Sequence, residues 1–163
     1  MKMELMSQNL VNIMYELVKN QGIARLLAND IKEPFSVEVK NPNALIMQRI
    51  DPLPFNIEAT TQDGTFIRVY YNQGSLDSSE AITESEILID IICSRNLWLI
   101  HDEIGRASIR PYEIMGRTID MLGKNSLNKT IRLEFDGYQH LYINNKFDCI
   151  RLYANYTSIE NTQ

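Results

Sequence analysis

The stretch that most constrains the fold is the apolar run Glu84–Cys93, which reads Glu-Ser-Glu-Ile-Leu-Ile-Asp-Ile-Ile-Cys. Successive side chains of a strand point to opposite faces. One face of this strand therefore carries Ile87, Ile89 and Ile91. The other face mixes apolar and acidic residues: Leu88, Ile92, Glu84, Glu86 and Asp90. A continuous apolar face opposite a mixed one predicts an inner strand with a helix packed on one side.

A helix that can supply this packing is predicted over Pro111–Leu122. Pro111 suits the first helical position, Glu113 suits the positive end of the helix dipole, and Gly123 suits a helix stop. Its apolar stripe consists of Ile114, Met115, Ile119 and Leu122. Gly116 in the middle costs about 1 kcal/mol of helix propensity relative to Ala, which predicts close packing at that point.

A second amphipathic helix is predicted near the N-terminus, over about Ser7–Asn20. Its apolar residues recur at the i, i+3, i+4, i+7 and i+8 spacing of a single stripe: Leu10, Ile13, Met14, Leu17 and Val18. Such a stripe indicates either core packing or a subunit contact.

The segment between this helix and the central strand is predicted as a connector, a hairpin and a loop. The connector, about residues 32–54, contains Pro34, Pro42, Pro52 and Pro54, each of which favours extended backbone in the residue before it. Strands 55–60 and 65–71 flank an Asp-Gly pair, the usual sequence of a hairpin turn. Residues 72–83 are rich in Ser, Asp, Glu, Gly and Asn and are predicted to form an acidic loop.

Three further strands are predicted at Ile131–Phe135, Tyr138–Ile143 and Phe147–Tyr156. The order of elements predicts an α+β fold, a mostly antiparallel sheet with both helices on one face. The 163 residues fit a single domain.

Composition excludes several classes of protein. No run approaches the roughly 20 apolar residues of a membrane helix, and the N-terminus lacks the pattern of a signal peptide, so a cytoplasmic location is expected. A net charge of −5 argues against a sequence-independent grip on nucleic acid. Cys93 and Cys149 are expected to be buried free thiols, and no Cys or His spacing indicates a metal or cofactor site.

The sharpest charge pattern is acidic. No Lys or Arg occurs between Arg68 and Arg95, where five carboxylates accumulate: Asp77, Glu80, Glu84, Glu86 and Asp90. One interpretation is a solvated loop and strand, and the other is an acidic surface that faces a channel or a shared space.

A third interpretation is catalytic. Carboxylates at alternate strand positions, here Glu84, Glu86 and Asp90, can hold Mg²⁺ as in metal-dependent nucleases. Such nucleases usually add a Lys on the same strand, but residues 91–93 are Ile, Ile and Cys. The sequence also lacks GxSxG, P-loop and GxGxxG motifs, so an enzyme is not expected.

Three segments carry a resemblance to a known group: "ILIDIIC" at 87–93, "RPYEIMGRTIDML" at 110–122 and "FDCIRLYANY" at 147–156. With the N-terminal helix, the Pro-rich crossing and the hairpin before them, their order resembles the small neck proteins of tailed bacteriophages. The likeness is to the tail terminator group, also described as tail completion or head–tail joining proteins. It covers about residues 55–156 and concerns the layout rather than residue identity.

This resemblance implies a structural virion protein that is assembled in the host cytoplasm. It implies a ring, commonly a hexamer, that caps the tail tube, joins it to the head connector or adaptor, and lets DNA pass without specific binding. In such a ring the acidic stretch 77–90 is expected near the lumen or a neighbour. Subunit contacts are expected from the apolar residues Leu10, Ile13, Met14, Leu17, Leu45 and Ile46.

Alternatives remain open at this stage. Within the same neck, a head-closure or adaptor protein is the alternative to a tail terminator. A metal-dependent nuclease that uses Glu84, Glu86 and Asp90, or a host-directed interaction module with one exposed apolar patch, represents a different class.

Overall fold

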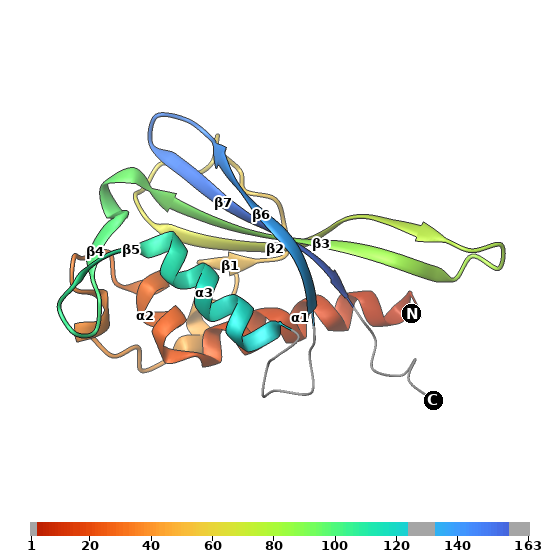
Figure 1. Cartoon of the computed structure of the whole chain (residues 1–163), viewed down its shortest axis with the longest axis horizontal. Helices are drawn as coiled ribbons and strands as arrows, with labels where there is room; N and C mark the ends of the chain where they lie inside the picture. The colour runs from red at the N-terminus through yellow and green to blue at the C-terminus, as the bar shows by residue number, and fades with distance from the viewer. Residues whose placement is uncertain (1–2, 124–132, 157–163) are drawn as a thin grey trace.

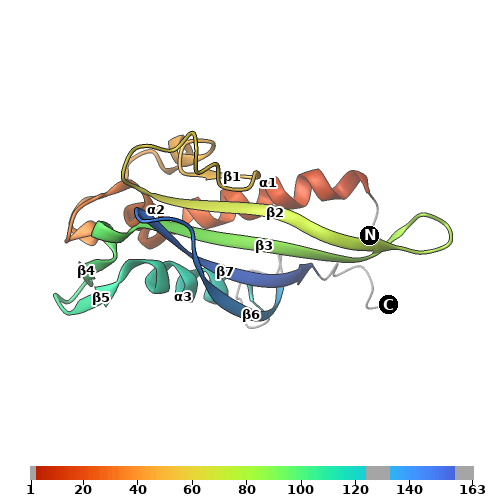
Figure 2. The same cartoon turned by 90° about the horizontal axis from the view of Figure 1, so that it is seen from above.

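The computed structural model describes residues 3–123 and 133–156. One five-stranded sheet, in the order β1-β2-β3-β7-β6, carries all three α-helices on one face (Figure 1, Figure 2). Only the short contact of β1 with β2 is parallel in this sheet, and its other three pairings are antiparallel. The predicted α+β class is confirmed.

The helices are α1 (Glu4–Lys19), α2 (Gln21–Ala28) and α3 (Arg110–Leu122), with short 3-10 turns η1 (Pro34–Ser36), η2 (Pro42–Leu45) and η3 (Arg95–Leu97). The strands of the main sheet are β1 (Ile50–Asp51), β2 (Thr65–Leu76), β3 (Ile82–Ser94), β6 (Leu133–Tyr142) and β7 (Phe147–Tyr156). A separate two-stranded sheet consists of β4 (Leu99–His101) and β5 (Ala107–Ile109).

The central strand is β3, as its pattern predicts. It pairs with β2 on one side and β7 on the other, and Ile87, Ile89 and Ile91 are fully buried in the core beneath the helices. The opposite side of the sheet, which we call the open face, is covered at one end by the ring of Phe55. There Ile92 packs in a small second cluster with three other buried residues: Phe66, Phe147 and Cys149.

Both predicted helices form. Four residues of the N-terminal stripe, Ile13, Met14, Leu17 and Val18, are buried in the main core. After α1 the chain turns at Asn20, which has extended backbone dihedrals, and a second helix, α2, begins at once because the side chain of Asn20 accepts a hydrogen bond from the backbone N–H of Ile23 and caps it. The close packing predicted at Gly116 is wrong: a Cβ placed there meets nothing within 4 Å.

The predicted hairpin at residues 55–71 is wrong. Residues 55–60 form turns instead of a strand, because Phe55 packs its ring against Phe66 and the carboxamide of Asn56 accepts hydrogen bonds from the N–H groups of Glu58 and Ala59. The true partner of β2 is β3.

The predicted acidic loop at 72–83 is wrong as well. β2 continues to Leu76 and β3 begins at Ile82, so only Asp77–Ala81 lie outside the two strands. Residues 72–75 of β2 are polar and exposed because no further strand among the described residues pairs with that edge, so the apolar alternation that marks a half-buried strand is missing there.

The predictions of the last strands and of the two cysteines agree more closely with the structure. The two strands predicted around Gly137 are one strand, β6, with a bulge between Phe135 and Gly137, and Ile131 falls outside the described residues. Cys93 and Cys149 are buried free thiols, as expected. Trp98 donates its ring N–H to the backbone oxygen of Cys93 at 3.2 Å.

The most constrained contact in the fold is made by Arg110, the first residue of α3, which is fully buried. Its guanidinium donates to four backbone oxygens, those of Leu26, Asn29, Ile31 and Leu97, at 2.6–3.1 Å. Two of these belong to the last turn and the C-cap of α2, where carbonyls lack helical partners and the helix dipole is negative. Arg110 therefore joins α2, α3 and the turn η3 that precedes β4.

We expect Arg110→Met to lower the free energy of unfolding by about 3 kcal/mol or more, because it leaves buried carbonyls without a donor. Urea denaturation measures this change. The matched control is Arg106→Met, whose side chain is 75% exposed and which is expected to change stability by less than about 1 kcal/mol. Equal losses in the two variants would contradict the role given to Arg110.

Candidate functional site: the arm and the open face

A two-stranded arm projects from the body of the protein (Figure 1, Figure 2). β7 pairs with β3 only from Glu86 onward, and β1 pairs with β2 only at Ile67 and Arg68. In residues 72–85, which we call the arm, β2 and β3 therefore have no other partner strand among the described residues than each other. An isolated two-stranded ribbon is at best marginally stable in water, so an arm of this kind is typical of an element that meets a partner.

The tip of the arm is ordered by Asp77. Its carboxylate accepts hydrogen bonds from the N–H and hydroxyl of Ser79 at 2.8 and 2.6 Å and from the N–H of Ala81 at 3.0 Å. These bonds, with that of the Ser79 hydroxyl foremost, hold the pKa of Asp77 below its usual value. Glu80 follows in the left-handed region, at φ 63°, which is strained for a residue with a side chain. Asp77 and Glu80 thus shape the tip and give it negative charge.

Asp90 does not belong to the exposed acidic set. It is only 4% exposed and forms an ion pair with Arg151, with Nε to Oδ1 at 2.7 Å and Nη2 to Oδ2 at 3.0 Å. The phenol of Tyr70 donates to the same carboxylate at 2.8 Å. The hydrogen bond to Asp90 raises the pKa of Arg151. Burial, together with the bond to Asp90, raises the pKa of Tyr70 to about 12.

The carboxylates that remain on the open face come from two strands. Glu86 lies opposite Asn155 on β7, and Asn155 lies opposite Glu134 on β6, so the three residues form one row on a single face. Glu84 lies further along the arm and is exposed, and Asp136 on β6 accepts a hydrogen bond from Asn155. We call Glu84, Glu86, Glu134 and Asp136 the acidic patch.

Cations on the open face are neutralised. Arg151 is paired with Asp90, and Arg68 is paired with Asp51 at 3.2 Å. Between Arg68 and Arg95 the sequence has no Lys or Arg. The open face around the arm therefore presents net negative charge.

Sequence reasoning missed Glu134 and Asp136, because nothing in a linear pattern shows that they lie beside residues some fifty positions earlier.

The metal-site interpretation does not match this arrangement. Asp90 is occupied by Arg151, while Glu86 accepts a hydrogen bond from the side chain of Asn72 at 2.8 Å. Within residues 3–123 and 133–156, no group of three His, Cys, Asp or Glu side chains is placed to hold a metal ion.

The residues expected to make subunit contacts are used inside the protomer. Ile13, Met14, Leu17 and Leu45 are buried in the main core, and Leu10 and Ile46 pack against it half-buried. The apolar stripe of α1 therefore holds the helix to the sheet and is not free to meet a neighbour.

An apolar groove that the sequence did not indicate lies at the base of the arm. It encloses about 360 Å³ between the start of α1 and the arm. Its apolar walls are Met3, Met6, Tyr71, Leu76 and Ile82. Gly74 and Ser85 line the same groove without bulky side chains.

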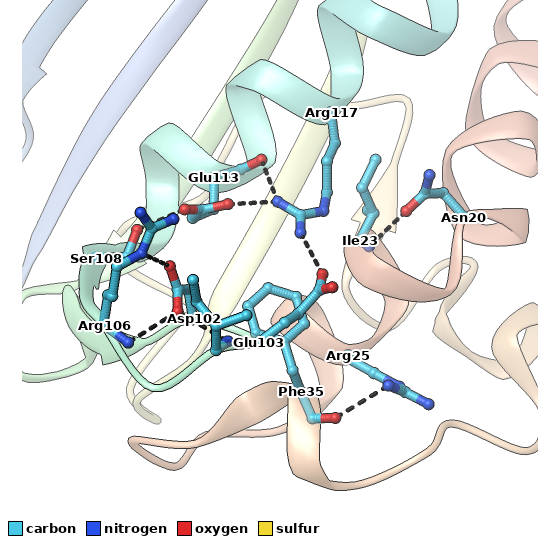
Figure 3. A network of polar contacts seen from close by, with 11 residues as sticks. Asn20, Ile23, Arg25, Phe35, Asp102, Glu103, Arg106, Ser108, Glu113 and Arg117 are labelled. Carbon is cyan, nitrogen blue, oxygen red and sulfur yellow. Dashed lines mark hydrogen bonds and ion pairs between the residues drawn. The ribbon is translucent and has the colours of Figure 1, made fainter.

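The opposite end of the molecule carries a polar network, shown in Figure 3. Arg117 on α3 pairs with Glu103 in the β4–β5 turn and with Glu113 one turn earlier, and its guanidinium lies over the ring of Phe35. A neighbouring cleft of about 490 Å³ is lined partly by Arg25 and His101. Arg25 donates to the backbone oxygen of Phe35, and His101 lies within hydrogen-bond distance of Glu33. Together with the Arg117–Glu103 pair, these contacts fasten the β4–β5 sheet and the segment 33–36 to α2 and α3.

His140 on β6 is held in a similar way. Its ring stacks on Trp98 with centroids 5.4 Å apart, and its Nε2 lies 3.0 Å from the carboxylate of Asp148, which also binds Arg95. These contacts make His140 part of the packing between β6 and the turn η3.

We expect alkaline titration of the tyrosines to show a component near pH 12 that Tyr70→Phe removes. The raised pKa of Tyr70 means that the folded state favours the protonated phenol. The phenol's contribution to the free energy of unfolding is therefore complete below pH 10 and is lost as the pH rises to 12. Ultraviolet absorbance against pH measures this. Tyr138→Phe, an exposed control on β6, should leave the component in place, and its loss there instead would contradict the assignment.

We also expect Glu80→Gly to make the arm more rigid, because Gly adopts φ 63° without strain. A gain of about 1 kcal/mol corresponds to roughly fivefold slower amide exchange at the tip. Hydrogen exchange followed by nuclear magnetic resonance measures it. Ser78→Gly, a neighbour without positive φ, should speed exchange, and the opposite order would contradict the strain at Glu80.

No helix in the described part of the chain is long and apolar enough to cross a membrane.

Comparison with known proteins places the chain in a phage context. The sequence model of a family named YomW matches residues 20–156. The family takes its name from an open reading frame of a Bacillus phage region, which indicates a phage-associated protein. No curated protein matches the chain.

Proposed function

The chain belongs to the YomW family, and on that premise we propose that it is a structural protein of a phage particle. In this proposal several copies, six in the commonest arrangement of such proteins, form a ring at the head–tail junction. The ring caps the tail tube, contacts the head connector or adaptor, and lets DNA pass through its centre. The layout that resembles tail terminators and the phage context of the family support the proposal together.

The observation that carries the proposal is the division of the sheet into two faces. The helices bury one face, and the open face keeps the acidic patch while Arg151 and Arg68 on that face are paired with Asp90 and Asp51. A surface of net negative charge repels phosphate, so DNA moves along it without being held. The open face is therefore the side that we assign to the channel.

The arm supports the oligomeric part of the proposal. It extends beyond the body and exposes Leu76, and the outer edges of its two strands have no partner strand among the described residues. Edges of this kind pair with other chains unless they are covered. A ring in which each arm reaches the next copy covers them.

A head-closure or adaptor protein of the same neck is the nearest alternative. Both proposals share the ring and the channel, and they differ in which structure the ring contacts. Deleting the gene in a phage separates them. Loss of a protein that caps the tube leaves tails of uncontrolled length, whereas loss of an adaptor leaves filled heads and tails of normal length that do not join.

We expect the purified protein to form a closed ring with a mass of several times 18.9 kDa, alone or when mixed with tail tubes. Mass photometry and electron microscopy measure this, and tubes with a ring at one end are the expected image. A protein that stays monomeric at micromolar concentration with and without tubes would contradict the proposal.

A further inference from the structure

The sheet ends in two free edges that differ from each other. β6 is the outer strand on one side, ten residues long and exposed over most of its length. On the other side, β2 has no strand partner beyond Arg68 among the described residues, so its arm portion is the second edge. Each copy thus offers two rows of backbone groups that can accept another strand.

The directions of the strands decide how these edges can meet. β2, β3, β7 and β6 follow one another across the sheet in antiparallel order, so β2 and β6 run in opposite directions. When the arm of one copy lies beside β6 of the next, the pair is therefore antiparallel and the sheet continues with its helices on the same side. A contact between two different edges is heterologous, and its repetition gives a closed ring when the rotation between copies returns to the first copy, and an open filament otherwise.

The side chains next to the two edges are complementary. Tyr138 on β6 is 61% exposed, although it is a large aromatic residue that gains most from burial. It lies opposite Leu152, a residue of the main core, and therefore points to the helix side of the sheet. The groove beside β2 lies on that same side, against the start of α1.

Gly74 leaves room for the phenol ring of Tyr138. It lies in β2 opposite Ser85 and lines the groove. A Cβ at this position would come within 2.6 Å of the backbone oxygen of Glu84, so the site has to stay without a side chain. An aromatic ring from a neighbouring strand often covers such an edge glycine.

We propose that the arm of one copy pairs through β2 with β6 of a second copy, with the ring of Tyr138 seated in the groove over Gly74. The contact joins unlike edges and repeats from copy to copy. This inference rests on the proposed ring and names the surface that builds it. A two-fold contact of β6 with β6 is the competing arrangement, and it leaves the groove empty.

Cysteine cross-linking tests the contact. With Tyr138 opposite Gly74, Gln139 lies opposite Gln73, and both glutamines are exposed on the open face. Paired strand residues lie within the Cα separation that a disulfide spans. The two native cysteines are buried and do not compete.

A mixture of Gln73→Cys and Gln139→Cys is expected to give a disulfide-linked dimer under mild oxidation, while each variant alone stays unlinked. The double variant is expected to give a ladder of linked copies up to the size of the ring. Leu53→Cys, which is exposed but lies off both edges, is the control and should not link to either variant.

Two results would overturn the proposal: Gln139→Cys linking to itself, which indicates a two-fold contact, or a mixture that stays unlinked. Tyr138→Lys provides a second measurement and is expected to weaken assembly at least tenfold, whereas Ile104→Lys, at a residue 73% exposed, should not. Equal assembly of both variants would also overturn it. Rings of full mass without the cross-link refute this contact and leave the proposed function standing, while absence of any assembly counts against both.

Discussion

The fold depends on one buried cation. Arg110 occupies the point where the end of α2, the start of α3 and the turn before β4 meet, and its guanidinium satisfies four backbone oxygens there. A charge in the interior is costly unless hydrogen bonds and an opposing dipole compensate it. Here the acceptors surround the guanidinium and include the negative end of a helix. That arrangement fixes the angle at which α2 and α3 lie against the sheet.

This arrangement leaves the sheet with two unlike faces. Because the helices all lie on one side, the other side is free to carry paired polar groups and the acidic patch. The β2–β3 ribbon extends past β1 and β7, so in the arm its outer edges have no neighbouring strand among the described residues. The features that we assign to assembly and to the DNA channel are therefore consequences of which face the helices cover and of where the pairing with β1 and β7 ends.

The sequence predicts the elements with strong periodicity and misses those whose environment is set by distant parts of the chain. Ile87, Ile89 and Ile91 identify the central strand because burial on one face gives period two, and Pro111 to Leu122 identify α3 by its stripe and caps. The Asp-Gly pair at 63–64 suggests a local hairpin, but tertiary packing of Phe55 against Phe66 prevails over it. The arm is mispredicted as a loop because residues 72–75 of β2 are all polar and exposed, so this part of the strand has no apolar alternation.

The candidate site, too, could be predicted from the sequence only in part, because it combines residues from distant parts of the chain. A run of acidic residues suggests a single surface, yet Asp90 is drawn into an ion pair by Arg151, which lies 61 residues later. Glu134 and Asp136 join the patch only through the register of β6 on β7. The groove between Met3 and Leu76 combines the first helix with the arm and has no counterpart in any local pattern.

Electron cryomicroscopy of the neck of a phage particle that carries this protein is the most direct measurement of the central claim. We expect a ring at the head–tail junction into which the structure fits, with the open face toward the channel and the helices outside. Absence of the protein from the junction, or a ring lined by α1, α2 and α3, would contradict it.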